Sequence, residues 1–304
     1  MEKIYDMIIV GGGPGGYTAA LYAARAGLDV LLVERLSAGG QMNLTGQIDT
    51  YPGFPEGVDG FQLSYNMQQQ AERFGAKTRY AEVLELQLAG EVKTIRTNEG
   101  EYFAKSVVIS TGANPRQLGV ERENEMIGRG VGYCAHCDGG FYRGKTVAVV
   151  GGGNSAVAEA LYLSRIAKEV ILIHRRDSLR ATHIYQKPLQ EAGNIRFVWD
   201  SEVTELLGEE VLSGVKIRNL KSGEEQILEI QGLFVSIGRK PATDLVKDQL
   251  TLDGAGYIMA GENTKTNLPG VYAVGDVRTK ELRQIVTAVA DGAMAAHVAE
   301  QELS

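Results

Sequence analysis

The residues of this sequence best suited to redox chemistry are two cysteines separated by two residues. Cys134 and Cys137 are the only cysteines among 304 residues, and Asp138 follows them directly. In a reducing cytosol, a Cys-x-x-Cys pair is more often catalytic or metal-binding than a structural cross-link. A structural zinc site would need four ligands, and the chain has no second cysteine pair. We therefore expect a redox-active disulfide and no metal site.

Two glycine-rich segments lie on either side of this pair, at residues 11–16 and 151–156. Each follows an apolar strand pattern and opens a helical pattern, so N–H groups at the helix start can face a pyrophosphate. One such motif alone is a weak signal, but two in the same context predict two dinucleotide sites. The expected contacts from these segments are Gly11, Gly13, Pro14, Gly15 and Gly16 in the first, and Gly151, Gly153, Asn154 and Ser155 in the second.

The elements around the two glycine segments form an internal repeat of a βαβ unit. The repeat distance is 140 residues, from Gly11 to Gly151, and in each copy the residue after the second strand, Glu34 or His174, stands 23 positions after the first glycine. The expected elements are strands 7–10 and 29–33 around a helix over 17–26, and strands 146–150 and 169–173 around a helix from about 156 to 166.

Residues just after the second strand of each copy should select the nucleotide, because an adenosine ribose is recognised there. Glu34, with Arg35 beside it, can accept hydrogen bonds from ribose hydroxyls and would repel a 2′-phosphate. His174 is followed by Arg175, Arg176 and Arg180, whose guanidinium groups can hold a 2′-phosphate through charge-assisted bonds. The first site is therefore expected to bind FAD or NAD, and the second NADPH.

A chemical argument favours FAD at the first site. A nicotinamide delivers a hydride, whereas a disulfide accepts two electrons and yields thiols. A flavin can accept the hydride and react with a sulfur, so it couples the two reactions.

The rest of the chain completes two domains of α/β class. Short alternating runs at 83–88 and 92–96, and others between 202 and 230, predict an antiparallel appendage on each Rossmann-like unit. The last 60 or so residues have no nucleotide turn of their own and are expected to complete the first domain. We therefore expect an FAD-binding domain formed by 1–113 and 242–304, with an NADPH-binding domain, 114–241, inserted in it and carrying the cysteine pair.

Composition limits the partners and the compartment. The formal charge is −7 and the sequence pI is about 5.3, which argues against nucleic-acid binding. No apolar run approaches the roughly 20 residues needed to span a bilayer. The chain runs directly into a strand with no signal-peptide pattern. A cytoplasmic protein without a membrane partner is expected.

Taken together, these motifs resemble those of bacterial low-molecular-weight thioredoxin reductases over nearly the entire chain. The segments that carry the resemblance are 11–16, 39–41, 51–53, 111–113, 128–130, 134–139, 151–156, 174–180, 275–276 and 283–284. It implies FAD, NADPH, thioredoxin as the protein substrate, and a homodimer. The further cofactor contacts that it implies are Gly40, Gln41, Thr50, Val83, Thr111, Gly112, Ala113, Gly275, Asp276, Arg283, Gln284 and Ile285 for FAD, and Ile237 and Gly238 for NADPH.

The resemblance also implies a mechanism. Electrons pass from NADPH through FAD to the Cys134–Cys137 disulfide, and the dithiol then reduces thioredoxin by exchange. Asp138 is the implied proton donor or acceptor, and Cys137 the sulfur nearer the flavin. One domain is expected to rotate against the other about hinges at 112–114 and 240–242.

Three positions depart from the family pattern: His136 between the cysteines, the pair Gly140-Phe141, and Thr50. Three other functions remain open. The chain could be a flavin disulfide reductase serving another carrier, a dithiol oxidase passing electrons to oxygen, or a nucleotide-sensing binding protein with an idle disulfide. The arginine cluster argues against the oxidase, and Asp138 beside the cysteines argues against the sensor.

Overall fold

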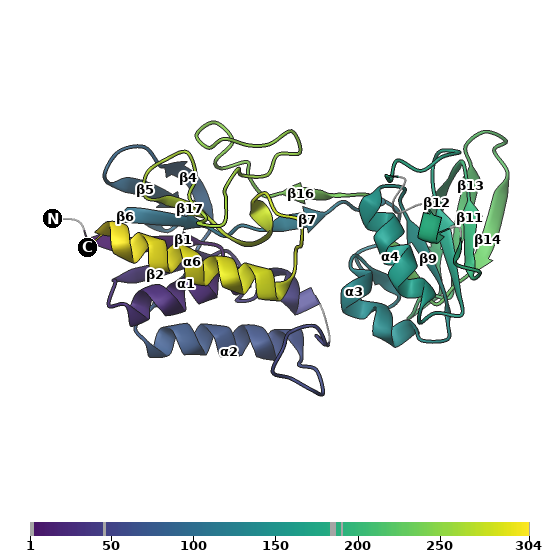
Figure 1. Ribbon diagram of the computed structural model, residues 1–304, viewed down its shortest axis with the longest axis horizontal. Coiled ribbons are helices and arrows are strands. Elements are labelled where there is room, and N and C mark those ends of the chain that lie inside the picture. The colour runs from purple at the N-terminus through teal and green to yellow at the C-terminus, as the bar shows by residue number, and fades with distance from the viewer. Residues whose placement is uncertain (1–2, 45–46, 183–186, 190, 304) are drawn as a thin grey trace. The chain divides into compact units, whose positions relative to one another are not determined.

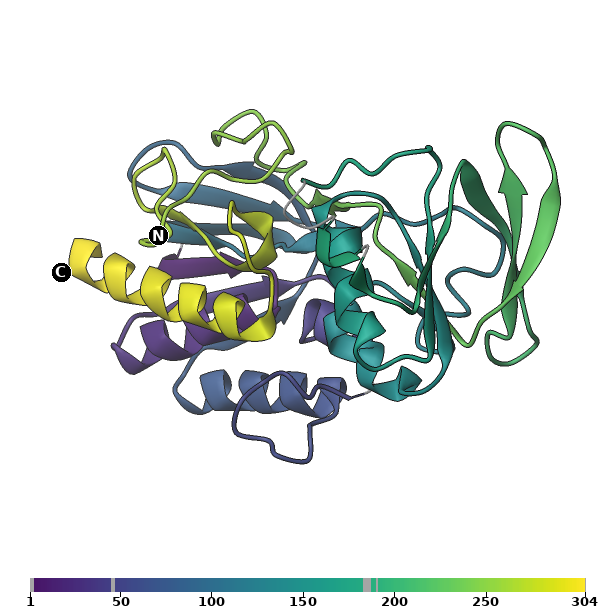
Figure 2. The same cartoon turned by 45° about the vertical axis from the view of Figure 1, so that its right-hand side comes forward.

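The structure is a computed structural model that describes residues 3–44, 47–182, 187–189 and 191–303. The chain divides into two compact units (Figures 1 and 2). The first comprises residues 1–46, 51–114 and 240–304, and the second comprises residues 47–50 and 115–239. Among the described residues, no helix is both long and apolar enough to cross a membrane.

The first unit is built on a seven-stranded sheet with the strand order β3-β2-β1-β6-β5-β4, and β17 also pairs with β6. Strands β1, β2, β3, β6 and β17 run parallel, while β4 and β5 add the antiparallel edge. Their bounds are β1 Ile4–Val10, β2 Val30–Glu34, β3 Lys77–Tyr80, β4 Val83–Gln87, β5 Lys93–Thr97, β6 Gly100–Ile109 and β17 Val271–Ala273.

Both faces of this sheet are covered, as its apolar strands require. Met7 and Ile9 of β1 pack into the core beneath three helices, α1 (Pro14–Arg25), α2 (Gly60–Arg73) and α6 (Ile285–Leu303), seen in front of the sheet in Figure 1. Ile8 and Val10 alternate to the opposite core, which includes residues of β4, β5 and the segment 246–258. The parallel strands thus end at one buried edge, where the glycine turn begins.

The second unit repeats the plan with a five-stranded parallel sheet of order β11-β10-β9-β15-β8. A separate antiparallel sheet of β12, β13 and β14 packs its apolar face on the same core. The strands are β8 Val131–Gly132, β9 Thr146–Val150, β10 Glu169–Ile173, β11 Ile195–Val198, β12 Ser201–Leu207, β13 Gly214–Asn219, β14 Glu225–Glu229 and β15 Gly232–Val235, and the helices are α3 Ala135–Asp138 and α4 Asn154–Ser164.

The two chain segments that connect the units lie beside each other. The short strands β7 (Ala113–Pro115) and β16 (Arg239–Pro241) form a two-stranded sheet. The amide of Ala242 donates to the carbonyl of Gly112 at 2.9 Å, and the Thr111 hydroxyl donates to the Ala242 carbonyl at 2.7 Å.

The predicted fold class is confirmed, with parallel sheets, helices and an antiparallel set of strands in each unit. The helix starts were predicted too late. Helix α1 begins at Pro14 rather than residue 17, and α4 at Asn154 rather than about 156. The last glycines of the turn already have helical geometry, and proline at the first helical position is favourable because its missing N–H would have no partner there.

Candidate active site

The glycine turn of the first unit follows β1 and leads into α1 with very little space around its backbone. Gly11 has φ +104°, and a Cβ there would lie 2.4 Å from the carbonyl oxygen of Ser110. A Cβ on Gly16 would lie 2.1 Å from the carbonyl oxygen of Gly11. Gly13 caps α1 without a side chain, and Pro14 starts it. These glycines bring the helix start against the strand end, where its amides can bind a pyrophosphate.

Glu34 is fixed against this turn. Its carboxylate accepts hydrogen bonds from the amides of Gly12 at 2.7 Å and Leu36 at 3.0 Å. The side chain of Arg35 is exposed and lies 4.0 Å from Glu82. Val83 begins β4 two residues after Ala81, whose amide donates to the Glu34 carbonyl. A carboxylate held at the end of β2 can accept hydrogen bonds from a ribose.

Segments far apart in the sequence join the turn. Gly40, in the 3₁₀-helix η1 (Gly40–Leu44), lies near enough that a Cβ on it would be 3.8 Å from the Cα of Gly13. A Cβ on Gly15 would be 3.6 Å from the amide nitrogen of Gly275. The amide side chain of Gln41 donates to the Ala113 carbonyl at 3.0 Å. The structure therefore brings the predicted residues from 11–16, 40–41, 113 and 275 together.

The turn that carries Gly275 and Asp276 depends on a buried charge network that sequence reasoning missed. Asp291 of α6 accepts from the Gly275 amide at 2.9 Å and forms ion pairs with Arg278 at 2.7 Å and Lys280 at 2.6 Å. All three side chains are at most 10% exposed. Asp276 lies in the 3₁₀-helix η3 (Gly275–Val277). An acidic residue amid an apolar helix pattern was the available signal.

The remaining predicted FAD residues do not all lie in the first unit. Arg283 lies over the Tyr257 ring at 4.0 Å, Gln284 precedes α6, and Ile285 begins it. Thr50 is exposed and falls in the segment 47–50, which groups with the second unit. The Nε of Arg283 and the Oδ1 of Asn43 are buried and have no hydrogen-bond partner within the described residues. These unpartnered atoms and the glycine-lined turn fit a polar dinucleotide such as FAD.

The second unit repeats this cradle. Gly151 has φ +152°, and a Cβ there would lie 2.3 Å from the carbonyl of Ser236, next to Ile237 and Gly238. Gly153 caps α4, whose first residues, Asn154 and Ser155, are exposed. The side chain of Asn154 accepts a hydrogen bond from the Thr182 amide at 2.9 Å. The helix start is thus open to a phosphate group.

The basic segment after β10 folds back over this turn. The amide of Arg180 donates to the Gly152 carbonyl at 2.7 Å. His174 is buried, with its Nε2 unpartnered within the described residues, and Trp199 contacts it edge-on. Burial lowers the pKa of His174, and the guanidiniums of Arg180, Arg176 and Arg175 lower it further.

Those three arginines form a patch of positive charge. All are exposed, and none forms an ion pair with an acidic residue in the part of the chain that the structure describes. All three act through their charge on the pKa of the same imidazole, that of His174. Such a patch can attract an anionic group such as a 2′-phosphate.

The cysteines are joined as the predicted disulfide, at the start of a short helix. Cys134 precedes α3, Cys137 lies within it, and their Cα atoms are 5.3 Å apart. The amides of Cys137 and Asp138 both donate to the Cys134 carbonyl at 3.1 Å. Gly139 packs against α4, where a Cβ would approach Tyr162 to 2.8 Å. His136 is exposed and stacks on Tyr162.

Two carboxyl groups beside the disulfide have raised pKa values. Burial raises the pKa of Asp138 to about 6. Burial also raises the pKa of Glu159 on α4 to about 7, and Ser236, the Ala135 backbone and Arg239 oppose this rise only in part. Near neutral pH both groups can hold or release a proton within reach of the redox helix. Glu159 was not predicted, because only the packing of α3 on α4 brings it there.

The raised pKa of Asp138 predicts a pH-dependent stability that asparagine removes. A carboxyl whose pKa rises from 3.8 to about 6 on folding binds protons more tightly when folded. Its contribution is present below the unfolded value and is lost as the pH rises through about 6. Asp138→Asn should therefore gain about 1.4 kcal/mol relative to the wild type between pH 5 and pH 8. Urea unfolding at both pH values measures this, and a constant difference between the two proteins would contradict it.

Comparison with known proteins agrees with this geometry. Residues 5–292 match the family model described as pyridine nucleotide-disulphide oxidoreductase. The thioredoxin reductase of Streptomyces coelicolor is 45% identical, over 100% of this chain and 95% of that protein. The bifunctional thioredoxin reductase/thioredoxin of Mycobacterium leprae is 42% identical over 100% of this chain and 67% of its own length. The crystal structure of thioredoxin reductase from Streptococcus pyogenes has a TM-score of 0.93 and 43% identity, covering 100% of this chain and 99% of that one.

Proposed function

The chain belongs to the pyridine nucleotide-disulphide oxidoreductase family, and from this membership we propose that it is a thioredoxin-disulfide reductase that transfers electrons from NADPH, through FAD, to oxidised thioredoxin. The single observation that carries the proposal is the Cys134–Cys137 disulfide, held in a chain with two dinucleotide cradles.

Each cofactor is assigned to one cradle. The cradle of the first unit would hold FAD through the 11–16 turn, Glu34 and the segment at 275–276, and that of the second would hold NADPH through the 151–156 turn and the arginine patch. When bound, the two supply hydride transfer and two-electron coupling to a disulfide. The protein's own contribution is to bind the phosphates, to choose between ribose and ribose 2′-phosphate, and to present the sulfurs.

The cysteines and Asp138 carry the exchange with thioredoxin. Reduction of the disulfide takes two electrons and two protons and yields two thiols, and a group that titrates near pH 6 can deliver or accept one of these protons. One cysteine thiolate then attacks a sulfur of the thioredoxin disulfide and forms a mixed disulfide. The second cysteine attacks that bond, which restores Cys134–Cys137 and releases reduced thioredoxin.

Thioredoxin as the carrier is supported by the relatives. The Mycobacterium leprae relative is named as a fusion of a thioredoxin reductase with a thioredoxin. Phe141, three residues after α3, is 50% exposed and offers an apolar contact beside the redox helix for such a partner. We expect this surface, more than the disulfide, to affect which thioredoxin is preferred.

Rotation between the units would let the dithiol alternate between cofactor and protein substrate. The paired connecting strands β7 and β16 suit a hinge, because only two short adjacent segments would have to change their dihedral angles. The residues that flank them, Gly112 with φ +71° and Gly238 with φ +111°, adopt backbone conformations that favour glycine.

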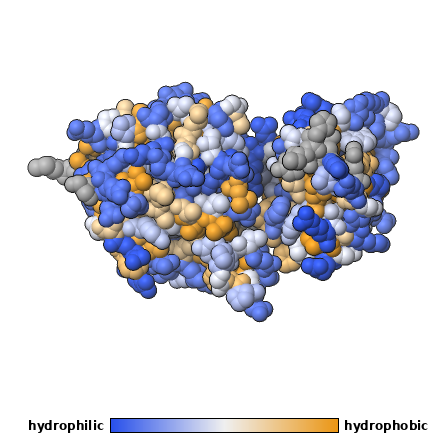
Figure 3. Space-filling model, viewed as in Figure 1, coloured by the Kyte–Doolittle hydropathy of each residue, from blue (hydrophilic) through white to orange (hydrophobic). Residues whose placement is uncertain are grey.

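We also infer a homodimer and a cytoplasmic location. Helices α1, α2 and α6 of the first unit leave apolar side chains exposed, among them Phe61 at 63%, Tyr65 at 49% and Tyr22 at 47%, and Figure 3 shows apolar residues gathered on the face that these helices form. A second copy would cover them. Sedimentation should then give twice the chain mass of 32.8 kDa. A reducing compartment suits a dithiol that must turn over.

The experiment that tests the proposed function is a steady-state assay of the purified protein. It should be yellow, contain one FAD per chain, and sustain NADPH oxidation beyond one equivalent per flavin only when oxidised thioredoxin is present. A colourless protein that FAD cannot reconstitute would contradict the assignment.

A further inference from the structure

A groove of about 770 Å³ opens on the first unit at the opposite end of the sheet from the glycine turn. It is lined by Ile4, the first residue of β1, by Gly270 just before β17 and by Tyr272 within β17. The 11–16 turn and the 275–276 segment follow the other ends of these two strands. None of its lining residues belongs to the cofactor or redox segments described above. Its volume is in the range of small-molecule sites.

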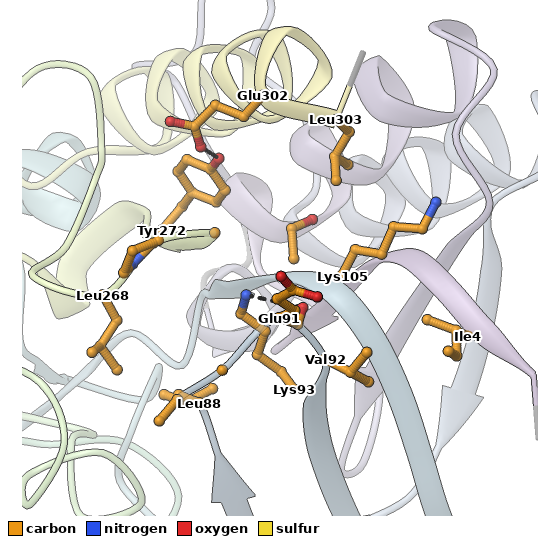
Figure 4. A pocket seen from close by; sticks show the side chains of 15 residues that line it. Ile4, Leu88, Glu91, Val92, Lys93, Lys105, Leu268, Tyr272, Glu302 and Leu303 are labelled. Carbon is orange, nitrogen blue, oxygen red and sulfur yellow. Dashed lines mark hydrogen bonds between the residues drawn. The ribbon is translucent and has the colours of Figure 1, made fainter.

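The walls of this groove are mainly apolar. Leu88 is buried in its floor, Leu268 and Leu303 are half-buried, and Val92 is 42% exposed at the rim (Figure 4). Such walls favour the hydrocarbon part of a ligand over water.

One buried cation interrupts the apolar lining. Lys93, the first residue of β5, is only 4% exposed, and burial lowers its pKa. Among the residues that the structure describes, its ammonium has one hydrogen bond, a long one of 3.4 Å to the carbonyl of Glu91. It forms no ion pair within the described residues. A buried ammonium group without a carboxylate partner is costly, and an anion would offset that cost.

The other charged groups of the groove already have partners, except the exposed Glu91. Glu302 accepts a hydrogen bond from the Tyr272 hydroxyl and forms an ion pair with Lys265. Lys105 forms an ion pair with Asp6 at 2.8 Å. Figure 4 shows Lys105 extending away from Lys93. Glu302 and Glu91 raise the pKa of Lys93 from a distance and thus only partly oppose the effect of burial. Lys93 is the group left to bind a ligand.

A glycine makes the space around this ammonium. Gly270 has φ +68°, and a Cβ on it would lie 2.8 Å from Nζ of Lys93. Its carbonyl accepts from the amide of Val107 at 2.9 Å, so the backbone is fixed against β6. Any other residue here would crowd the ammonium.

We propose that this groove binds a small organic anion with an apolar body, whose carboxylate pairs with Lys93 and whose hydrocarbon part lies on Leu88, Val92 and Leu268. A medium-chain fatty carboxylate has this chemistry. Two of its features are complementary to the groove: one negative charge for one unpaired buried cation, and an apolar chain for the apolar walls.

Calorimetric titration of the FAD-loaded protein with decanoate tests the proposal. One decanoate should bind per chain without displacing FAD or competing with NADPH. A hydrogen bond to a charged group contributes about 1.5–3 kcal/mol, which corresponds to roughly ten- to a hundredfold in affinity. Lys93→Met, which keeps the apolar volume, should weaken binding by about that factor, and decanol should bind the wild type more weakly by a similar factor.

Lys105→Met is the matched control, since it removes a lysine that lines the same groove but is already paired, and its affinity for decanoate should change less than about twofold. Decanoate binding that is equal in the wild type and Lys93→Met would overturn the proposal. The proposal would also be overturned if the wild type showed no saturable binding of decanoate while Lys93→Met differed from the wild type in oligomeric state. A second copy of the chain would then occupy the groove. If Lys93→Met fails to fold, the comparison of decanoate with decanol decides alone: equal binding contradicts the role of the charge.

Discussion

Serine in place of either Cys134 or Cys137 should abolish thioredoxin turnover while flavin reduction by NADPH continues. A hydroxyl oxygen cannot form or exchange a disulfide. The single variants therefore lose the exchange with thioredoxin altogether and do not merely slow it. The loss should be on the order of a thousandfold or more, as for other residues that react covalently. The hydrogen bonds that shape α3 join backbone groups, from the Cys137 and Asp138 amides to the Cys134 carbonyl, and serine keeps them.

Two measurements on each variant separate chemistry from folding. Thioredoxin reduction is followed at steady state, and flavin bleaching by NADPH is followed without oxygen. His136→Thr is the control, because His136 stands between the cysteines but is exposed, and its turnover should stay within a few-fold of the wild type. Normal turnover in either serine variant would show that the assigned pair is not the one that exchanges with thioredoxin.

Neutralising Arg175 and Arg176 together should collapse the preference for NADPH over NADH. The arginine patch has no acidic partner in the described residues, and a 2′-phosphate is absent from NADH. A hydrogen bond to a charged group contributes about 1.5–3 kcal/mol, and each tenfold in affinity corresponds to about 1.4 kcal/mol. The Michaelis constant for NADPH should therefore rise by about ten- to a thousandfold, with partial additivity, while that for NADH changes little.

A matched control for this double variant is Arg196→Ala. Arg196 lies in the same unit on β11, but it pairs with Glu169 at 3.0 Å and is not part of the patch. It should leave both Michaelis constants unchanged, and flavin content should be equal in all variants. Equal losses with NADPH and NADH in the double variant would mean that the arginines support the fold or the pyrophosphate site instead.

Local patterns were sufficient to predict which elements surround the nucleotide turns, although not where the two helices begin. Strands β9 and β10 have the predicted bounds, because continuous apolar runs between polar residues predict buried parallel strands. Helix α2 was not predicted, since its glutamine-rich sequence has little apolar content and it buries only one narrow face at Leu63, Ser64 and Ala71. Asp59, whose side chain caps the amide of Gln62, was a usable signal for its start.

Features that depend on distant contacts could not be predicted. Glu159 reaches the redox helix only through helix packing, and the network of Asp291, Arg278 and Lys280 forms only after α6 folds onto η3. Lys93 looks like an ordinary strand residue in the sequence, yet it is 4% exposed once Gly270, 177 positions later and just before β17, lies beside it. Such groups have no local signature, because their properties come from burial and from partners far along the chain.

The most direct test of the central claim is an anaerobic stopped-flow experiment on the FAD-loaded protein. Addition of NADPH should bleach the flavin absorbance, and subsequent addition of oxidised thioredoxin should restore it, with two thioredoxin thiols formed per NADPH consumed. A flavin that bleaches with NADPH but regains its colour only when oxygen is admitted, with the thioredoxin still oxidised, would contradict the claim and identify the chain as an oxidase.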